Sequence, residues 1–247
     1  MHVVAVVAAG GQGARLGQLV PKQFVELGGR SLLERSVTAL LASPRIQQVV
    51  VALPAEYLAD LPQYLRDARV LVVAGGLRRQ DSVANAVNAV PAEAEVVLIH
   101  DAARPFVDLA TIDRVIDAAA AAGAAIAALP AGDTVKLADI TETSWVGAEF
   151  GDPLPAVRPK PVPAVKRTLP RETIFLAQTP QGFRRDVLTR VIALGAQGAE
   201  GTDEAALAEQ AGCTVLLVPG DPRNIKITTV ADLAFARGLL LERGELS

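Results

Sequence analysis

Short, uninterrupted runs of apolar residues alternate with helix-like stretches along almost the whole chain. Such runs are typical of strands buried on both faces of a parallel sheet. The predicted strands cover residues 3–8, 48–52, 70–73, 96–99, 125–128, 174–177 and 214–218. The predicted helices cover residues 31–42, 55–65, 79–88, 109–122, 184–194, 203–209 and 230–243. Because right-handed crossovers place helices on both faces, the pattern predicts an α/β fold with a doubly wound, mostly parallel sheet in a three-layer sandwich.

The composition fits a single domain with a sizeable core. The chain has 247 residues, of which 51% are hydrophobic, and a formal net charge of −3. Its mixed charges predict no basic groove for nucleic acid and no polybasic membrane patch. The one cysteine, Cys213, excludes a disulfide framework, fits a cytoplasmic protein and is expected to be a small core residue. The apolar run at residues 3–9 leads into glycines without a preceding basic segment, so we interpret it as a strand rather than a signal sequence.

One segment, residues 138–170, interrupts this alternation. It contains six prolines and has weak periodicity. Because proline fixes φ and lacks an N–H donor, the segment is expected to form neither a central strand nor a continuous helix. It is either a loose surface loop or an arm that packs on a second subunit.

A glycine-rich loop, residues 8–16, follows the first strand, and its glycines are Gly10, Gly11 and Gly13. Glycines let the backbone approach a ligand closely, so that N–H groups can converge on phosphate oxygens. Leu16 stands where a dinucleotide fingerprint needs its third glycine, and Arg15 stands where a P-loop needs serine or threonine after its lysine. The loop therefore predicts a phosphate site that belongs to neither of these two classes.

Two cations follow the glycines, Arg15 and Lys22. Two fixed cations beside a glycine loop suit a substrate with several phosphate charges, such as a nucleoside triphosphate. They would stabilise the charge that develops on an α-phosphate and on departing pyrophosphate.

The apolar run at residues 96–99 ends in His100-Asp101-Ala102-Ala103-Arg104. This order places the Asp101 carboxylate at the carboxyl edge of the sheet, where ligands bind in open α/β folds. Mg²⁺ needs one or two protein carboxylates plus phosphate oxygens, so Asp101 is a candidate metal ligand. His100 is expected to be a packed histidine. Arg104 pairs either with an anionic substrate group or with Asp101.

Other polar clusters occur at residues 75–83, 178–181, 201–204 and 224–228. The first is a glycine turn before a predicted helix and suits a base or ribose. Thr202 is a candidate helix N-cap. Lys226 lies in an apolar context, so it is either a snorkelling lysine or a third cation in the site. With two histidines and one cysteine, a structural zinc site is not expected.

Taken in this order, the motifs resemble those of the 2-C-methyl-D-erythritol 4-phosphate cytidylyltransferase family. The most specific parts are His100-Asp101-Ala102-Ala103-Arg104-Pro105 and Gly75-Gly76-x-x-Arg79-Gln80-Asp81-Ser82-Val83. The similarity spans residues 8 to about 237. It implies a Rossmann-like nucleotidyltransferase domain over residues 1–247, with residues 138–170 as a homodimerisation arm. It also implies CMP transfer from CTP to methylerythritol phosphate, with release of pyrophosphate.

The resemblance also implies roles for individual residues. The nucleotide would be held by Ala9, Gly10, Gly11, Gly13, Gly76, Ser82 and Ala102. The catalytic cations would be Arg15, Lys22 and Lys226, and Asp101 would bind Mg²⁺. The second substrate would be bound by Arg104, Arg171, Thr179 and Thr202, with Arg171 reaching the neighbouring subunit's site.

Three departures from the family pattern keep alternatives open. The double glycine Gly10-Gly11 is more similar to ribitol- or ribulose-5-phosphate cytidylyltransferases. Leu77 stands where relatives often carry an acidic residue, and the arm is longer and richer in proline. Outside this reaction class, the remaining hypotheses are a nicotinamide-dependent oxidoreductase and a catalytically silent nucleotide-binding protein.

Overall fold

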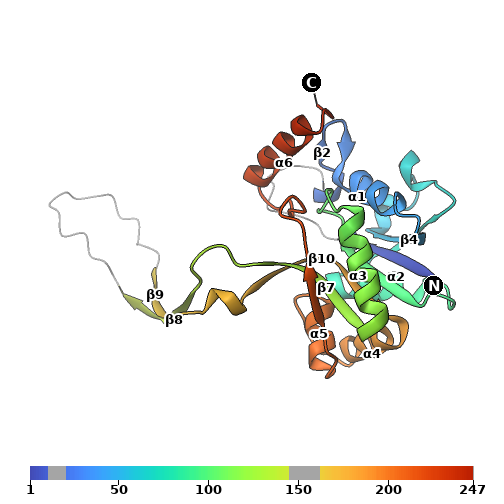
Figure 1. Cartoon of the computed structure of the whole chain (residues 1–247). Coiled ribbons are helices and arrows are strands. Elements are labelled where there is room, and N and C mark those ends of the chain that lie inside the picture. The colour runs from blue at the N-terminus through green and yellow to red at the C-terminus, as the bar shows by residue number, and fades with distance from the viewer. Residues whose placement is uncertain (11–20, 145–161, 247) are drawn as a thin grey trace. The chain divides into compact units, whose positions relative to one another are not determined.

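The computed structural model describes residues 1–10, 21–144 and 162–246. The chain divides into two compact units, one formed by residues 1–129 and 177–247 and the other by residues 130–176. Figure 1 shows the elements of both units along the chain.

The first unit is built on a seven-stranded sheet with the strand order β11-β7-β10-β6-β1-β4-β5. Its strands are β1 (Val3–Ala8), β4 (Ile46–Leu53), β5 (Val70–Ala74), β6 (Val96–Asp101), β7 (Ala124–Pro130), β10 (Phe175–Arg184) and β11 (Leu216–Pro219). The β1, β4, β5 and β6 strands pair in parallel, as do β7 and β11, whereas β10 pairs antiparallel with β6. The sheet is thus mostly parallel, as predicted.

Helices cover both faces of this sheet. They are α1 (Leu32–Leu41), α2 (Arg79–Asn88), α3 (Leu109–Ala122), α4 (Arg185–Ala196), α5 (Glu204–Gln210) and α6 (Val230–Glu242). Alternate residues of β1 enter two different cores: Val3, Ala5 and Val7 pack with α1 and α3, and Val4 and Val6 pack with α2, α4 and α5. This two-sided burial explains the uninterrupted apolar runs and confirms the three-layer sandwich.

Local signals fix where several helices begin. Ser31 and Asp108 cap α1 and α3 by accepting hydrogen bonds from the N–H groups of Glu34 and Thr111. In α6, Thr229 and Asp232 form a reciprocal capping box. Through a third apolar cluster, this last helix packs on the short β2 strand (Glu26–Leu27), which pairs with β3 (Arg30–Ser31). The helix ends therefore follow from a few polar side chains.

Most predicted elements are confirmed, and those over residues 79–88 and 109–122 coincide with α2 and α3. The helix predicted over residues 55–65 is wrong. Two separate 3₁₀ turns, Ala55–Tyr57 and Gln63–Leu65, stand there instead, and each follows a proline. Pro62 lacks the N–H donor and its ring would clash with the preceding turn, so one continuous helix cannot form. Cys213 packs beside one core as a partly buried residue, as expected.

The second unit contains an antiparallel pair of strands, β8 (Lys136–Ser144) and β9 (Val162–Thr168), which form a sheet of their own. Lys136 Nζ donates a hydrogen bond to Thr168 Oγ1 at 2.7 Å, across the first pair of this ladder. The prediction that residues 138–170 supply no central strand is confirmed for the part of this segment that the structure describes. Its role as a dimerisation arm remains a prediction.

None of the helices in the described ranges is long and apolar enough to cross a membrane.

Close packing at Gly182 of β10 gives a test of this fold. A Cβ atom at this position would lie 2.7 Å from Val115 Cγ1 and 3.0 Å from Ala119 Cβ, both on α3. We expect Gly182→Ala to lower the free energy of unfolding by roughly 1–3 kcal/mol, because the helix must move away from the sheet. Urea unfolding measures this change.

Gly238→Ala is the matched control, because no atom lies within 4 Å of the position where its Cβ would stand in α6. We expect it to be neutral or to stabilise by up to about 1 kcal/mol, as alanine favours a helix over glycine. An equal decrease in the free energy of unfolding in the two variants would contradict the close packing of Gly182 against α3.

Candidate active site

A cavity of about 160 Å³ opens at the carboxyl ends of β1 and β6, where Ala8 and Asp101 are paired. It is lined by Ala8, Ala9, Gly10, Lys22, Gln23, Arg79, Ser82, Asp101, Ala102, Ala103 and Lys226. Seven of the residues predicted to bind nucleotide, metal or phosphates thus lie around one cavity: Ala9, Gly10, Lys22, Ser82, Asp101, Ala102 and Lys226. The predicted residues Gly11, Gly13 and Arg15 lie outside the described residues.

One wall of this first cavity is a close approach between the loop after β1 and the first turn of α2. A Cβ atom on Gly10 would lie 2.5 Å from Ser82 Oγ, so only glycine fits there without displacing Ser82. The same hydroxyl accepts a hydrogen bond from the Gly76 N–H at 3.0 Å. Gly76 does not line the cavity itself, but it fixes the Ser82 side chain that does.

A second cavity, of about 120 Å³, adjoins the carboxyl-terminal motifs. It is lined by Arg79, Asp101, Arg104, Ala177, Gln178, Thr179, Gln181, Thr202, Asp203 and Lys226. Three of the four residues predicted for the second substrate, Arg104, Thr179 and Thr202, lie here. The fourth, Arg171, belongs to the second unit, where its guanidinium donates to the Gly132 carbonyl at 3.2 Å.

Three residues line both cavities: Arg79, Asp101 and Lys226. We call these three residues the shared wall. Ligands bound in the two cavities would therefore meet at this wall, which has Asp101 at its centre.

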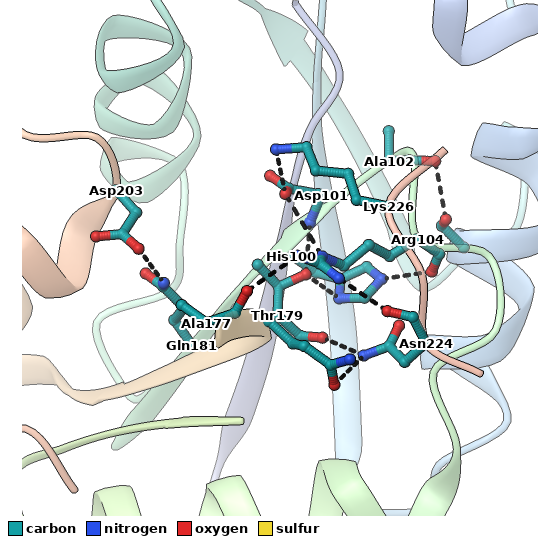
Figure 2. Close-up of polar contacts among 12 residues, drawn as sticks. His100, Asp101, Ala102, Arg104, Ala177, Thr179, Gln181, Asp203, Asn224 and Lys226 are labelled. Atoms are coloured by element: carbon teal, nitrogen blue, oxygen red, sulfur yellow. Dashed lines mark hydrogen bonds and ion pairs between the residues drawn. The ribbon is translucent and has the colours of Figure 1, made fainter. Parts of the chain in front are cut away.

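The Asp101 carboxylate is surrounded by cations although its side chain is only 10% exposed. Lys226 Nζ lies 2.8 Å and Arg104 Nε 3.8 Å from Oδ2, and Arg79 Nε lies 3.3 Å from Oδ1. Figure 2 shows Lys226 and Asp101 directed toward each other. Burial raises the pKa of Asp101, but Arg79, Lys226 and Arg104 outweigh it, so that pKa lies well below its ordinary range. The carboxylate is therefore ionised at neutral pH.

Arg104 is tied to the backbone as well as to Asp101. Its two terminal nitrogens donate to the carbonyl oxygens of Asn224, at 2.8 Å, and Ala177, at 3.2 Å. Burial lowers the pKa of this guanidinium, and Asp101 raises it only in part. Arg104 thus lies close to Asp101, which was one of its two predicted partners. Lys226, whose side chain is 43% exposed, is a cation of the site that also reaches water.

Polar neighbours behind Asp101 hold the site in one arrangement. Thr179 Oγ1 accepts a hydrogen bond from the Asp101 N–H at 3.1 Å and lies 3.0 Å from His100 Nδ1. His100 Nε2 lies 3.0 Å from the Arg104 carbonyl oxygen, which can only accept. The neutral histidine is therefore protonated at Nε2 and accepts the Thr179 hydroxyl proton at Nδ1. This fully satisfied, buried His100 matches the expected packed histidine.

Gln178 and Asn224 extend this frame between β10 and the segment before α6. Asn224 Nδ2 donates to the Thr179 carbonyl at 2.7 Å, and Gln178 Nε2 donates to the Asp221 carbonyl at 2.9 Å. Both residues belong to motifs singled out in the sequence, but their residue types did not predict that their side chains would hold the site together by hydrogen bonds. Figure 2 shows how Asn224 and Thr179 meet below the site.

The N-cap assigned to Thr202 is wrong. The α5 helix is capped by Asp203, whose carboxylate accepts a hydrogen bond from the Ala206 N–H at 2.9 Å. Asp203 also accepts from Gln181 Nε2 at 2.8 Å. Thr202 is thereby left with its side chain exposed at the second cavity.

Sequence reasoning missed Arg79 and Glu204 as site residues. Arg79 NH1 lies 2.9 and 2.7 Å from the two carboxylate oxygens of Glu204, whose side chain is 1% exposed. Arg79 stands in the quoted glycine-turn motif, which was the available signal. Nothing in the local sequence shows that Glu204, 125 positions further on, is its partner.

A family model described as 2-C-methyl-D-erythritol 4-phosphate cytidylyltransferase matches residues 3–147 and 152–242. The chain belongs to this family. The cytidylyltransferase of Deinococcus radiodurans is 45% identical over 96% of this chain and 89% of its own length. A bifunctional enzyme IspD/IspF of Anaeromyxobacter dehalogenans is 47% identical over 97% of this chain. The chain spans only 57% of that bifunctional relative.

Solved cytidylyltransferase structures share the fold. The 2-C-methyl-D-erythritol 4-phosphate cytidylyltransferase of Thermus thermophilus superposes with a TM-score of 0.74 at 34% identity, covering 97% of this chain and 98% of that one. The 4-diphosphocytidyl-2C-methyl-D-erythritol synthase of Anaerococcus prevotii gives a TM-score of 0.79 at 25% identity, covering 97% and 96%. The resemblance seen in the motifs of this cytidylyltransferase family member is thus confirmed over nearly its whole length.

The buried His100 predicts how stability depends on pH. Burial lowers its pKa from 6.5 to about 4, so between these values the unfolded chain binds a proton that the folded chain excludes. This contribution to stability is present above pH 6.5 and is lost as pH falls toward 4. We expect the free energy of unfolding to fall by roughly 2 kcal/mol more between about pH 7 and about pH 4.5 in the wild type than in His100→Gln. Urea unfolding at the two pH values measures this difference, and identical pH responses would contradict the assignment.

Proposed function

We propose that this chain transfers CMP from CTP to 2-C-methyl-D-erythritol 4-phosphate and releases pyrophosphate. The observation that carries the proposal is the shared wall of Arg79, Asp101 and Lys226 between two cavities. Membership of the cytidylyltransferase family supports the identity of both substrates. It also argues against the oxidoreductase and the catalytically silent alternatives.

The first cavity suits the nucleotide. The loop at Ala9 and Gly10 allows close backbone approach, and Ser82 of α2 lines the same cavity and accepts a hydrogen bond from the Gly76 N–H. We assign the cytidine to this side and the phosphates to the side of Lys22 and Lys226. That Gly11, Gly13 and Arg15 also bind the triphosphate remains a prediction from the sequence.

The second cavity suits the acceptor phosphate. In the reaction, an oxygen of the acceptor phosphate forms a bond to the α-phosphorus of CTP. The bond from that phosphorus to the bridging oxygen breaks, and pyrophosphate leaves with the electron pair. Because the attacking phosphate is already an anion, no strong base is needed. We assign Thr202 and Arg104 to position the acceptor phosphate, and Thr179 to hold the backbone at Asp101 beside it. Charge stabilisation by Lys22 and Lys226 completes the catalysis.

The residues of the first cavity fit a Mg²⁺ ion. Asp101 is the one carboxylate among the described residues that line this cavity. One carboxylate is sufficient for Mg²⁺ when phosphate oxygens and water complete the coordination. The 3.3 Å contact with Arg79 is long, so Oδ1 keeps acceptor capacity for an ion. When bound, Mg²⁺ would neutralise phosphate charge, and we assign Asp101 to hold it.

We further propose that the chain is a cytoplasmic homodimer. The described strands of the proline-rich segment form a sheet of their own, which supports a role outside the central sheet. In this proposal residues 138–170 form the dimer interface, and Arg171 serves the partner subunit's acceptor site.

A second acceptor fits the same chemistry, because Gly10-Gly11 resembles pentitol-phosphate enzymes. Pyrophosphate release from CTP with Mg²⁺ separates the acceptors when methylerythritol phosphate, ribitol 5-phosphate and ribulose 5-phosphate are compared. We expect the largest kcat/KM with methylerythritol phosphate. Pyrophosphate release with ribitol 5-phosphate but not with methylerythritol phosphate would refute methylerythritol phosphate as the acceptor. No release with any of the three would refute the proposed reaction.

Lys22→Ala tests the role of a phosphate cation. Lys22 lines the first cavity, and its loss should remove charge stabilisation that develops in the transition state. We expect kcat to fall roughly hundredfold, which corresponds to a rise of about 3 kcal/mol in the activation free energy. The KM for methylerythritol phosphate should change much less. Steady-state kinetics measures both constants. The exposed α6 residue Arg237 provides the control, and kcat of Lys22→Ala close to that of Arg237→Ala would contradict the assignment.

A further inference from the structure

Arg79 lies between two carboxylates that come from different parts of the chain. Its NH1 group contacts both oxygens of Glu204, the first residue of α5, at 2.9 and 2.7 Å. Its Nε group contacts Asp101, the last residue of β6, at 3.3 Å. These are the carboxylate partners of Arg79 among the described residues. Glu204 is thus linked to the centre of the shared wall through one guanidinium.

Glu204 is held in place by the start of its own helix. Gln181 of β10 donates to Asp203 Oδ2 at 2.8 Å and accepts from the Ala205 N–H at 3.2 Å. Figure 2 shows the Gln181–Asp203 contact beside the site. These bonds tie the residues before and after Glu204 to the central sheet. The carboxylate therefore has one position from which to engage Arg79.

Charge and burial explain what this contact does. The Glu204 carboxylate is almost completely buried, so it needs a cation, and Arg79 supplies one. A guanidinium prefers to grip a carboxylate with two N–H groups, but the contact with Asp101 uses Nε alone. Both oxygens of Glu204 hold the guanidinium at NH1, and in the resulting orientation Nε alone contacts Asp101, at 3.3 Å. Without Glu204, Arg79 would be free to close on Asp101 with two N–H groups and occupy both of its oxygens.

We propose that Glu204 is a positioning residue that confines Arg79 to one contact with Asp101 and so keeps the Asp101 carboxylate available to Mg²⁺ and CTP. This inference rests on the proposed function, because it assumes that Asp101 faces a metal-bound nucleotide. Glu204 itself lines neither of the two cavities of the site.

Glu204→Gln tests the proposal, because it keeps the shape of the side chain and removes the charge that holds Arg79. CTP binding is measured by isothermal titration calorimetry at a series of Mg²⁺ concentrations, without an acceptor. We expect the Mg²⁺ concentration for half-maximal binding to rise roughly tenfold or more, as is typical when a partner of a metal ligand is lost. Glu209→Gln removes the same charge from an exposed site on the same helix and should match the wild type.

The double variant Arg79→Met/Glu204→Gln separates positioning from a structural role. With the guanidinium gone, Glu204 has nothing to position, and the Mg²⁺ requirement of the double variant should match that of Arg79→Met alone. An unchanged requirement in Glu204→Gln would overturn the proposal. A requirement in the double variant clearly above that of Arg79→Met alone would also overturn it, because Glu204 would then not act through Arg79.

Thermal unfolding shows whether Glu204→Gln is folded. Should it fail to fold, Glu204→Asp keeps the charge on a shorter side chain and carries the same expected direction; an unchanged Mg²⁺ requirement there would overturn the proposal. A wild type that binds CTP with Mg²⁺ but transfers nothing to any acceptor would refute the proposed function and leave this inference standing. A wild type whose CTP binding does not depend on Mg²⁺ would refute the inference and the metal assignment together.

Discussion

The ionised carboxylate of Asp101 is the charge around which the site is organised. It lies at the end of a central strand and is approached by cations from α2, from the turn after β6 and from the segment before α6. The Arg104 side chain is 11% and the Arg79 side chain 30% exposed, so the carboxylate offsets part of the free-energy cost of burying these two cations. One side chain therefore brings three separate segments to the same edge of the sheet.

The position of that carboxylate depends on uncharged neighbours. Asp101 is paired with Ala8 in the sheet, and its backbone N–H is bound by Thr179 of the antiparallel strand β10. His100, held neutral by burial, completes the frame without adding charge. A protonated histidine here would add a fourth cation beside Asp101, so the low pKa of His100 preserves the charge balance of the site. The uncharged side chains of Thr179 and His100 thus fix the geometry of the site, and the charged side chains packed beside them supply its chemistry.

Periodicity predicted the sheet and most helices, and the resemblance to the family predicted that Lys22, Asp101 and Lys226 lie together at one site. Periodicity gave a wrong prediction where one residue prevents the expected element, as at Pro62. Two 3₁₀ turns stand there in place of one predicted helix. The β10 strand was predicted too short, because Gln178 and Gln181 interrupt its apolar pattern while lying buried at the site. Burial of polar side chains depends on tertiary partners, which a local pattern does not contain.

The ion pair of Arg79 with Glu204 could not be predicted from the sequence, for the same reason. Two charged residues far apart in sequence have many possible partners, and only the fold selects one. A similar limit applies to Thr202, which has the right residue type for a cap although Asp203, the next residue, takes that position. Residue type predicts which chemistry is available at a site, whereas the packing of strands and helices decides which side chain performs it.

The central claim is that two substrates meet at the shared wall of Arg79, Asp101 and Lys226. A crystal structure with α,β-methylene CTP, Mg²⁺ and methylerythritol phosphate tests it most directly. The account predicts an acceptor phosphate oxygen about 3–3.5 Å from the α-phosphorus, in line with the leaving group and beside Lys226. An acceptor phosphate bound away from this wall, or a nucleotide whose α-phosphate does not reach it, would contradict the account.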